Sequence, residues 1–436
     1  MSDLIQPRVL KGFRDFLPEA EIGRTNLTEK ITQVYRSFGF VPIDTPVLEY
    51  TEILLRKSNG ETEKQVFRFE DNGGRDVALR FDLTVPFARF TAEHKNELYF
   101  PFKRYHIAKV WRGEKPQAGR YREFVQCDID TVGSDSAAAD FEILNVMKAA
   151  LNGIGVENIT IHVNHRGIFN RFLANLGVSE KSEDILRSVD KLAKVGGEEV
   201  LKELNEFTGD EKKAEKIIEY ISSKGSFEEI LSKIEALAGG ADSDTQRMRD
   251  IYEMMKAAGI EKTYVLDPSI TRGLDYYTGV VYETFLNDLP SIGSVCSGGR
   301  YDNLAGLYMK EKVPGVGASI GIDRLIAGLE QLGVFKAEGS YLDAEIYCLD
   351  AKNSIYYQKI AAKLRSLGIN VEVFPDAKKM AQQYAVTTAK GVKWGIMLGE
   401  EEIKSGTISL KNLTNREIKS GLTAEKAAEI IKTAKV

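Results

Sequence analysis

Apolar side chains recur at helical intervals between residues 21 and 38, and Gly39 follows as a stop signal, so this stretch predicts an amphipathic helix. The apolar positions on its buried face are Ile22, Leu27, Ile31, Val34 and Phe38. The next segment, FGFVPIDTPVLEY, contains two prolines that are incompatible with a continuing helix. It predicts extended structure with an edge or interface strand.

Alternating apolar and polar residues then predict strands joined by hairpins. The runs 66–70 and 76–81 are separated by an Asn-Gly-Gly turn, which is typical of a hairpin. A second pair, KRYHIAKVWRG and RYREFVQCDIDTVG, flanks the polar loop EKPQAG, and YYTGVVYETFL adds a further strand. These hairpin connections predict an antiparallel sheet rather than a doubly wound parallel one.

The periodicity changes twice more and divides the chain into domains. Charged helical runs fill residues 166–259, so we expect a helical insertion within a sheet domain made of residues 1–165 and 260–332. Residues 333–340 are expected to form a linker. In residues 341–436, the strand-like runs AEIYCLD, NVEVFP and WGIMLG alternate with helical runs around 354–367 and 378–389, which predicts a small α/β domain. The fold class is therefore α+β.

Composition supports a folded, multidomain protein. The 436 residues are 43% hydrophobic and 28% charged, with 11 prolines, and this length suits two or three domains. No signal peptide and no run of about 18 apolar residues is present, so we expect a cytoplasmic protein outside the membrane. The three cysteines are too far apart for a zinc site or a disulfide framework and are expected to be packing residues.

Charge is distributed unevenly along the chain. The formal net charge is −5, which disfavours indiscriminate nucleic-acid coating. Residues 341–436 hold 15 Lys and Arg against 11 Asp and Glu, a net +4, which leaves −9 for the rest. A phosphate-bearing partner is therefore expected to bind the C-terminal part.

The first cluster of candidate binding residues surrounds the loop in VWRGEKPQAGRYREF. Arg112, Lys115, Arg120 and Arg122 can place guanidinium forks and an ammonium group on the phosphates of a nucleotide. Phe124 lies two residues beyond Arg122, on the same strand face, where it can stack on a base or pack in the core.

Gln126, Asp128 and Asp130 continue along that face of the strand. Acceptors in a row beside arginines suit a small zwitterion, because the carboxylates can bind its ammonium group and an arginine its carboxylate. A solvated strand face with internal ion pairs is the alternative interpretation.

Two glycine-rich segments supply further candidates. SITRGLDYYTG sets an arginine and paired tyrosines between glycines, and SGGRYDNL precedes GVGASIGIDRL, in which Arg324 falls in the first turn of a helix. GVGASIG has the spacing G-x-G-x-x-x-G, and no G-x-x-x-x-G-K-[ST] occurs, so a parallel-sheet nucleotide fold is disfavoured. His162 and His165 should face opposite sides of a strand, so no protein metal site is expected, and any metal is expected to be Mg²⁺ carried by a nucleotide.

Taken together, these segments resemble the histidyl-tRNA synthetases, a family of class II aminoacyl-tRNA synthetases, over the whole chain. The first helix with FGFVPIDTPVLE is similar to class II motif 1, KVWRGEKPQAGRYREFVQCDID to motif 2 and GVGASIGIDRL to motif 3. RGLDYYTG and SGGRYDNL resemble the segments specific to the histidine enzymes. The resemblance implies a class II catalytic domain and a C-terminal anticodon-binding domain, with ATP, Mg²⁺, L-histidine and tRNA(His) as ligands. It also implies a homodimer with Pro46 at the interface.

The resemblance also implies roles for individual residues. Arg112 would bind the α-phosphate of ATP and the histidine carboxylate, and Arg272 would stabilise charge on the α-phosphate; these two are the catalytic candidates. The residues implied for ATP are Arg112, Glu114 at the adenine edge, Arg120, Phe124 stacked on adenine, and Arg324 at the γ-phosphate. The residues implied for histidine are Asp82, Thr84, Arg112, Gln126, Asp130, Arg272, Tyr276, Tyr277 and Tyr301.

In that assignment, Asp82, Thr84, Gln126 and Asp130 hold the α-amino group, and the tyrosines line the imidazole pocket. Many bacterial members carry glutamate where Asp82 and Asp130 stand, and the aspartates resemble the eukaryotic and archaeal pattern. Three alternatives stay open: an inert paralogue acting as the regulatory subunit of an ATP phosphoribosyltransferase, a synthetase for another amino acid such as threonine or proline, and an RNA-binding module without activity.

Overall fold

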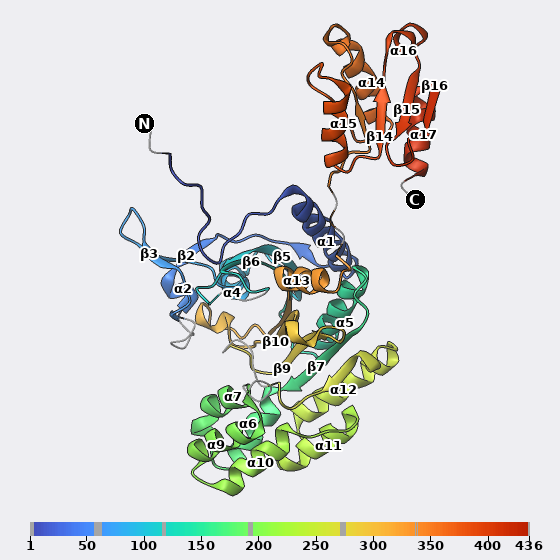
Figure 1. The fold of residues 1–436 in the computed structure, drawn as a ribbon. Helices are drawn as coiled ribbons and strands as arrows, with labels where there is room; N and C mark the ends of the chain where they lie inside the picture. Colours follow the sequence, from blue (N-terminus) through green and yellow to red (C-terminus); the bar gives the residue numbers. More distant parts are fainter. Residues whose placement is uncertain are drawn as a thin grey trace. The chain divides into compact units, whose positions relative to one another are not determined.

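The computed structural model describes residues 4–55, 63–115, 119–190, 195–270, 276–335, 337 and 339–434. The chain forms two compact units, and Figure 1 shows the elements of each. The first unit comprises Met1–Arg14 and Leu27–Phe335, and the second comprises Asp15–Asn26 and Lys336–Val436. Among the described residues, no helix combines the length and the apolar character that crossing a membrane requires.

The centre of the first unit is an eight-stranded sheet, counted over the described residues, with the order β1-β5-β6-β11-β10-β9-β7-β8. Neighbouring strands from β5 to β7 run antiparallel, whereas the outer pairs β1/β5 and β7/β8 run parallel. The predicted antiparallel sheet is thus confirmed. The strands are β1 (Val41–Pro42), β5 (Phe102–Trp111), β6 (Glu123–Val132), β7 (Ile159–His165), β8 (Tyr264–Leu266), β9 (Val280–Leu286), β10 (Cys296–Arg300) and β11 (Gly315–Gly321).

The predicted N-terminal helix is α1 (Pro18–Ser37), and Gly39 follows it with a φ of +82°. The predicted hairpin consists of β3 (Arg68–Glu70) and β4 (Asp76–Leu79), which pair antiparallel. Strand β2 (Leu48–Tyr50) extends this into a small three-stranded sheet beside α2 (Thr51–Leu55). The other helices next to the large sheet are α4 (Thr84–Glu93), α5 (Ala137–Gly153) and α13 (Ile322–Gln331).

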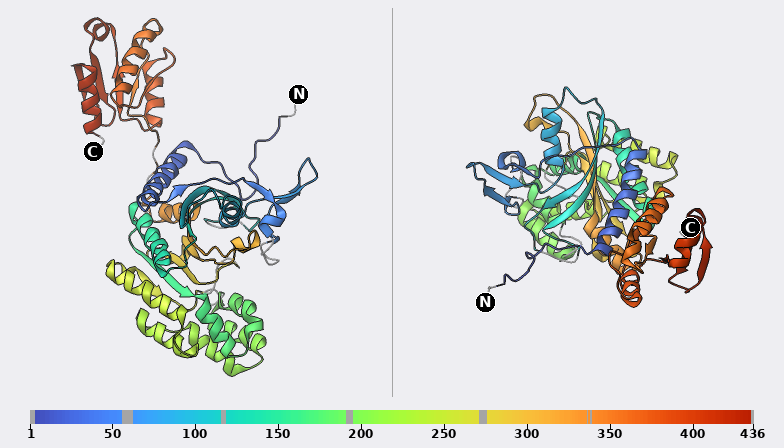
Figure 2. Two further views of the ribbon diagram at one scale, coloured as in Figure 1. Left: turned by 180° about the vertical axis from the view of Figure 1, so that it is seen from behind. Right: turned by 90° about the horizontal axis from the view of Figure 1, so that it is seen from above.

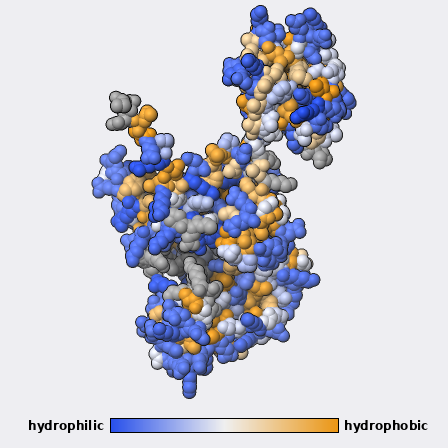
Figure 3. All heavy atoms as spheres, viewed as in Figure 1, coloured by the Kyte–Doolittle hydropathy of each residue, from blue (hydrophilic) through white to orange (hydrophobic). Residues whose placement is uncertain are grey.

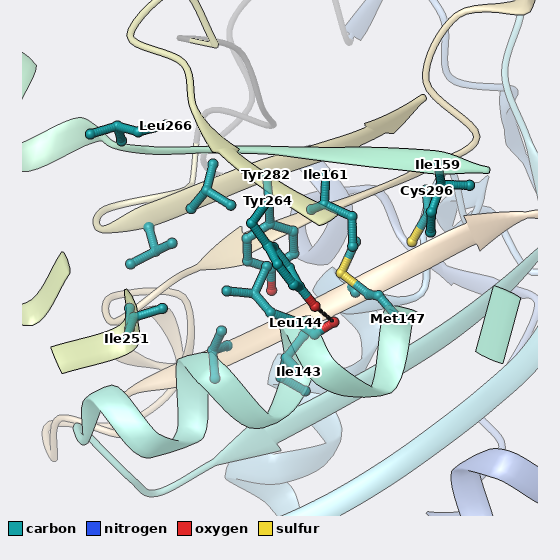
Figure 4. Packing of buried hydrophobic residues seen from close by; sticks show 14 of the residues in the cluster. Ile143, Leu144, Met147, Ile159, Ile161, Ile251, Tyr264, Leu266, Tyr282 and Cys296 are labelled. Carbon is teal, nitrogen blue, oxygen red and sulfur yellow. Dashed lines mark hydrogen bonds between the residues drawn. The ribbon is translucent and has the colours of Figure 1, made fainter. Parts of the chain in front are cut away.

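Helix α5 buries its apolar face against the sheet. Figure 4 shows Leu144 and Met147 of α5 beside Ile161 of β7 and the rings of Tyr264 and Tyr282. The Tyr264 hydroxyl, buried in this core, donates a hydrogen bond of 3.0 Å to the Leu144 carbonyl oxygen, so its polar atom is satisfied. The three cysteines are buried, as expected for packing residues.

The predicted helical insertion lies between β7 and β8. Figure 2 shows its helices gathered beside one end of the large sheet, and Figure 3 shows mainly hydrophilic side chains over the far end of this bundle. Helical starts are marked by capping residues, for example Ser226 and Asp242, which each form a capping box. The described helices are α6 (Arg166–Asn175), α7 (Ser182–Asp190), α9 (Gly197–Thr208), α10 (Glu211–Ile221), α11 (Phe227–Leu237) and α12 (Ser243–Ala257).

A buried charge network joins the insertion to the sheet. The Asp140 carboxylate of α5 lies 2.7 Å from Nη1 of Arg247 in α12 and 2.7 Å from Nη2 of Arg300 in β10. Arg300 also pairs with Asp302 at 3.1 Å. Because a buried carboxylate needs such partners, this network fixes α12 next to the strand that leads into Tyr301.

The second unit contains a five-stranded sheet in its described part, with the order β13-β12-β14-β15-β16. The predicted strands β12 (Ala344–Ile346), β13 (Val371–Val373) and β14 (Trp394–Met397) pair in parallel, and the predicted helices are α14 (Ser354–Ser366) and α15 (Met380–Ala389). Four elements were not predicted: α16 (Glu400–Ser405), the antiparallel strands β15 (Ile408–Asn412) and β16 (Ile418–Leu422), and α17 (Ala424–Thr433).

Candidate active site

The site is built on β6 and its neighbour β5. Their antiparallel register places Arg104 opposite Asp130, His106 opposite Asp128, and Ala108 opposite Gln126. Side chains of directly opposed residues lie on the same face of a sheet, so this face carries a row of polar groups. Gln126, Asp128 and Asp130 of β6 are buried, with exposed fractions of 8% or less, which excludes the alternative of a solvated strand face.

One end of this row meets tyrosines from two distant segments. The Tyr301 hydroxyl donates a hydrogen bond to Oδ1 of Asp130, and the Tyr276 hydroxyl donates one of 3.1 Å to Oδ2 of Asp82. The Tyr276 ring lies 5.0 Å from the Tyr277 ring and 5.9 Å from the Tyr301 ring, between centroids. The structure therefore brings together Asp82, Asp130 and all three tyrosines that the sequence singled out.

Asp82 also organises the start of α4. Its Oδ1 accepts a hydrogen bond of 3.1 Å from the Val85 backbone N–H, so the carboxylate occupies the amino end of the helix whose first residue is Thr84. Gln126 donates from Nε2 to the Ser319 hydroxyl at 2.8 Å, while its Oε1 is buried without a hydrogen-bond partner. These residues place carboxylate, hydroxyl and amide acceptors around one small region.

Burial controls the protonation of the three carboxyl groups. It raises the pKa of Asp82, Asp128 and Asp130, and the positive charge of Arg104 opposes this rise for each of them. A buried carboxylate without enough cations takes up a proton more readily than one in water. A ligand with an ammonium group would supply the missing positive charge.

The other end of β6 gathers cations. Nε of Arg112 donates a hydrogen bond of 2.9 Å to the Phe81 carbonyl oxygen, and its guanidinium carbon lies 5.2 Å from the centre of the half-buried Phe124 ring. Arg120 lies 3.6 Å from the Glu114 carboxylate. Arg122, another phosphate candidate from the sequence, donates a hydrogen bond of 3.2 Å from Nε to the Glu114 carbonyl oxygen and so stabilises the loop.

Arg324 joins this cluster from the first turn of α13. Its Nη1 donates a hydrogen bond of 2.7 Å to the Ser294 carbonyl oxygen. Burial and the positive charges of Arg120 and Arg112 lower the pKa of Arg324 to about 10, although the negative charges of Glu114 and Glu283 oppose this change. Arginines that repel one another at a helix amino end form an anion site, since a bound phosphate relieves the repulsion.

Two further predictions concern Arg272 and a Mg²⁺ ion carried by the nucleotide. Arg272 lies outside the described residues. No group of three or more His, Cys, Asp or Glu side chains in the described segments is arranged to hold a metal ion. Mg²⁺ carried by nucleotide phosphates needs only one or two protein carboxylates, and Glu114 and Glu283 are close enough to Arg324 to influence its pKa.

Sequence reasoning missed Arg104 and His106. Arg104 is fully buried, and its Nη2 lies 2.6 Å from Oδ2 of Asp130. His106 Nε2 lies 3.0 Å from Oδ1 of Asp44, and burial and Arg104 lower its pKa to about 3, so this imidazole is neutral. The available signal was their spacing of two in KRYHIAKVWRG, which puts both on one strand face.

The antiparallel sheet, the polar row on β6 and the β11–α13 element together define a class II aminoacyl-tRNA synthetase. The family model for histidyl-tRNA synthetase matches residues 12–325, and the anticodon-binding domain model matches residues 343–434. A histidine–tRNA ligase of Treponema denticola is 63% identical over 95% of this chain and 96% of its own length. One of Treponema pallidum is 54% identical over 96% of both chains.

The fold comparison agrees. The crystal structure of histidyl-tRNA synthetase from Nostoc sp. PCC 7120 matches with a TM-score of 0.88 and 31% identity, covering 99% of this chain and 100% of that one. The chain belongs to the histidyl-tRNA synthetase family, and its enzyme class is that of a histidine–tRNA ligase. The resemblance stated from the sequence is therefore confirmed.

Proposed function

We propose that this chain activates L-histidine with ATP to form histidyl-adenylate and pyrophosphate, and then transfers histidine to the 3′ end of tRNA(His). The observation that carries the proposal is that the two ends of β6 have different surroundings. Buried carboxylates and tyrosines surround one end, and arginines from neighbouring segments surround the other. The histidine carboxylate attacks the α-phosphorus in line, and the bond to pyrophosphate breaks. Positioning and electrostatic stabilisation supply the catalysis, and no covalent enzyme intermediate forms.

At the acidic end, the proposed ligands of the histidine α-amino group are Asp82, Thr84, Gln126 and Asp130. Three tyrosines line the ring pocket, and Tyr277 is the proposed partner of an imidazole nitrogen. A buried site that hydrogen-bonds a ring nitrogen rejects analogues that lack it, because the protein group is then left unpaired. This polar pocket accounts for selectivity among amino acids.

At the basic end, Arg112 is the proposed ligand of the α-phosphate and of the histidine carboxylate. Phe124 stacks on adenine, Glu114 binds the adenine edge, and Arg120 and Arg324 bind the outer phosphates. Arg272 is the proposed second cation at the α-phosphate. Mg²⁺ would arrive with ATP and would offset part of the phosphate charge; Glu283, whose negative charge acts on Arg324, is a described carboxylate that would be able to hold it.

We assign the catalytic domain to residues 1–165 and 260–332, the insertion to 166–259, the linker to 333–340 and the anticodon-binding domain to 341–436. The enzyme is placed in the cytoplasm, where tRNA is charged. Incubation of the purified chain with ATP, labelled histidine and a tRNA(His) transcript tests the overall reaction. Histidine attached to tRNA supports the proposal, and an uncharged transcript under conditions that charge it with an authentic synthetase contradicts it.

We also propose that the enzyme is a homodimer. A cavity of about 650 Å³ opens beside α1 and β1, lined by Thr32, Arg36, Pro46, Arg80 and His106 among others. It contains Pro46, which the resemblance places at the subunit interface. Sedimentation equilibrium at micromolar concentration is expected to give twice the chain mass of 48.6 kDa, and a stable monomer would contradict this assembly.

A further inference from the structure

Several residues of the proposed amino-acid pocket have buried polar atoms without hydrogen-bond partners. Among the described residues, they include Nε and Nη1 of Arg104 and Oε1 of Gln126. Buried polar groups in folded proteins nearly always have partners, so each of these atoms requires a reason. Arg104 is the most costly of them, because its side chain is completely buried and carries a full charge.

The contacts of Arg104 connect three parts of the pocket. Its Nη2 lies 2.6 Å from Oδ2 of Asp130 and 4.0 Å from Oδ2 of Asp128, both on β6. The same nitrogen donates a hydrogen bond of 3.2 Å to the Leu83 carbonyl oxygen. The guanidinium carbon lies 4.4 Å from the centre of the Phe87 ring in α4.

The position of Leu83 gives these contacts their significance. Leu83 stands between Asp82 and Thr84, two proposed ligands of the histidine amino group. One guanidinium group therefore spans the distance between this segment and Asp130, the proposed ligand on β6. Arginine suits this place because its planar fork can contact several acceptors in fixed directions, which a lysine ammonium cannot do.

We propose that Arg104 is a positioning residue of the amino-acid pocket, which holds Asp128 and Asp130 of β6 against the Asp82–Thr84 segment so that the carboxylates face the histidine ammonium group. This inference rests on the proposed function, because it takes the amino-group ligands from it. Arg104 itself acts through these carboxylates and not on the reacting phosphorus.

Charge makes the role testable. The titratable and charged groups that act on these carboxylates come from α1, the segment between β4 and α4, β5, β6, the segment before β9, β9 itself, β10 and the residue after β10. Burial raises the pKa of Asp128 and Asp130, and Arg104 is the first cause that lowers each of them. The groups are Tyr35, Arg80, Asp82, Arg104, His106, Asp128, Asp130, Tyr276, Tyr277, Tyr282, Cys296 and Tyr301.

Removing the cation therefore raises the pKa of both carboxyl groups further. At neutral pH, a larger fraction of the variant then has protonated Asp128 and Asp130 carboxyl groups. This fraction lacks the negative charge that attracts an ammonium group. Since the ionised form binds histidine, the defect shrinks as the pH rises through the new pKa values. A structural defect alone would not produce this pH dependence.

The experiment compares Arg104→Met with the wild type in histidine-dependent pyrophosphate exchange between pH 6.5 and 8.5. Met approximates the length of the arginine stem without its charge. We expect the KM for histidine at pH 7 to rise about tenfold or more, which corresponds to about one pKa unit, while the KM for ATP stays within about twofold. The KM for histidine of the variant should fall as the pH increases. Arg89→Met, which removes a half-buried arginine of α4 paired with Glu49 at 2.9 Å, is the matched control and should leave both KM values unchanged.

The possible outcomes distinguish failure of the proposed function from failure of the role proposed for Arg104. Absence of histidine-dependent exchange in the wild type contradicts the proposed function itself. An active wild type with an Arg104→Met variant whose KM values for histidine and ATP rise equally, without pH dependence, overturns the role of Arg104. If Arg104→Met does not fold, Arg104→Lys decides: a raised KM for histidine alone supports the role, and wild-type values for both substrates overturn it.

Discussion

Replacing Arg112 with alanine is expected to lower kcat/KM for histidine activation by about 10²–10³-fold, the usual loss when one group that stabilises transition-state charge is removed. Its Nε donates a hydrogen bond of 2.9 Å to the Phe81 carbonyl oxygen, which orients the guanidinium group that the proposal assigns to the α-phosphate and the attacking carboxylate. Histidine-dependent pyrophosphate exchange measures this effect. Far-UV circular dichroism and thermal unfolding should remain close to those of the wild type, because Arg112 is only half-buried.

Arg112→Lys is the matched variant. It keeps the charge but loses the planar fork, so its activity should fall between those of Arg112→Ala and the wild type. If the alanine variant exchanged pyrophosphate at the wild-type rate, Arg112 would not be a ligand of the reacting phosphate.

Deleting the residues after Gly339 is expected to abolish tRNA charging, with a loss of about 100-fold or more, while histidine-dependent pyrophosphate exchange changes only severalfold. The removed segment includes the match to the anticodon-binding domain, and residues 341–436 carry a net charge of +4 that attracts tRNA phosphates. All the proposed ligands of ATP and histidine precede Gly339 in the sequence. Both reactions are measured on the same preparation.

Thermal unfolding of the truncated protein serves as the control for folding. A folded truncated enzyme that charges tRNA(His) as fast as the full chain would show that the C-terminal domain does not contribute to tRNA binding. Equal loss of both reactions in a folded protein would place part of the adenylation site in the removed segment.

The large sheet was predictable mainly where apolar and polar residues alternate, as in β5 and β6. Strand β10 was not recognised, because its sequence CSGGR resembles a loop. Its glycines are required by close packing: a Cβ atom on Gly298 would lie 2.1 Å from the Gly317 carbonyl oxygen and 2.5 Å from the Tyr282 ring. Such a requirement depends on neighbouring strands and cannot be read from local pattern.

The candidate site was predictable for a different reason. Its residues lie in short segments with unusual combinations of charge, tyrosine and glycine, and the structure brings Asp82, Asp130, Tyr276 and Tyr301 into contact. Arg104 escaped notice because KRYHIAKVWRG looks like a strand with a charged, exposed face. Its burial depends on α4 and on β6, and β6 joins it only through the register of the sheet.

The most direct test of the central claim, that β6 holds histidine at its acidic end and ATP at its basic end, is exchange of labelled pyrophosphate into ATP, measured with each of the twenty amino acids and without tRNA. The account predicts exchange with histidine alone. Exchange with a different amino acid would contradict the assignment of the pocket, and exchange with none would favour an inert paralogue that keeps the fold without the reaction.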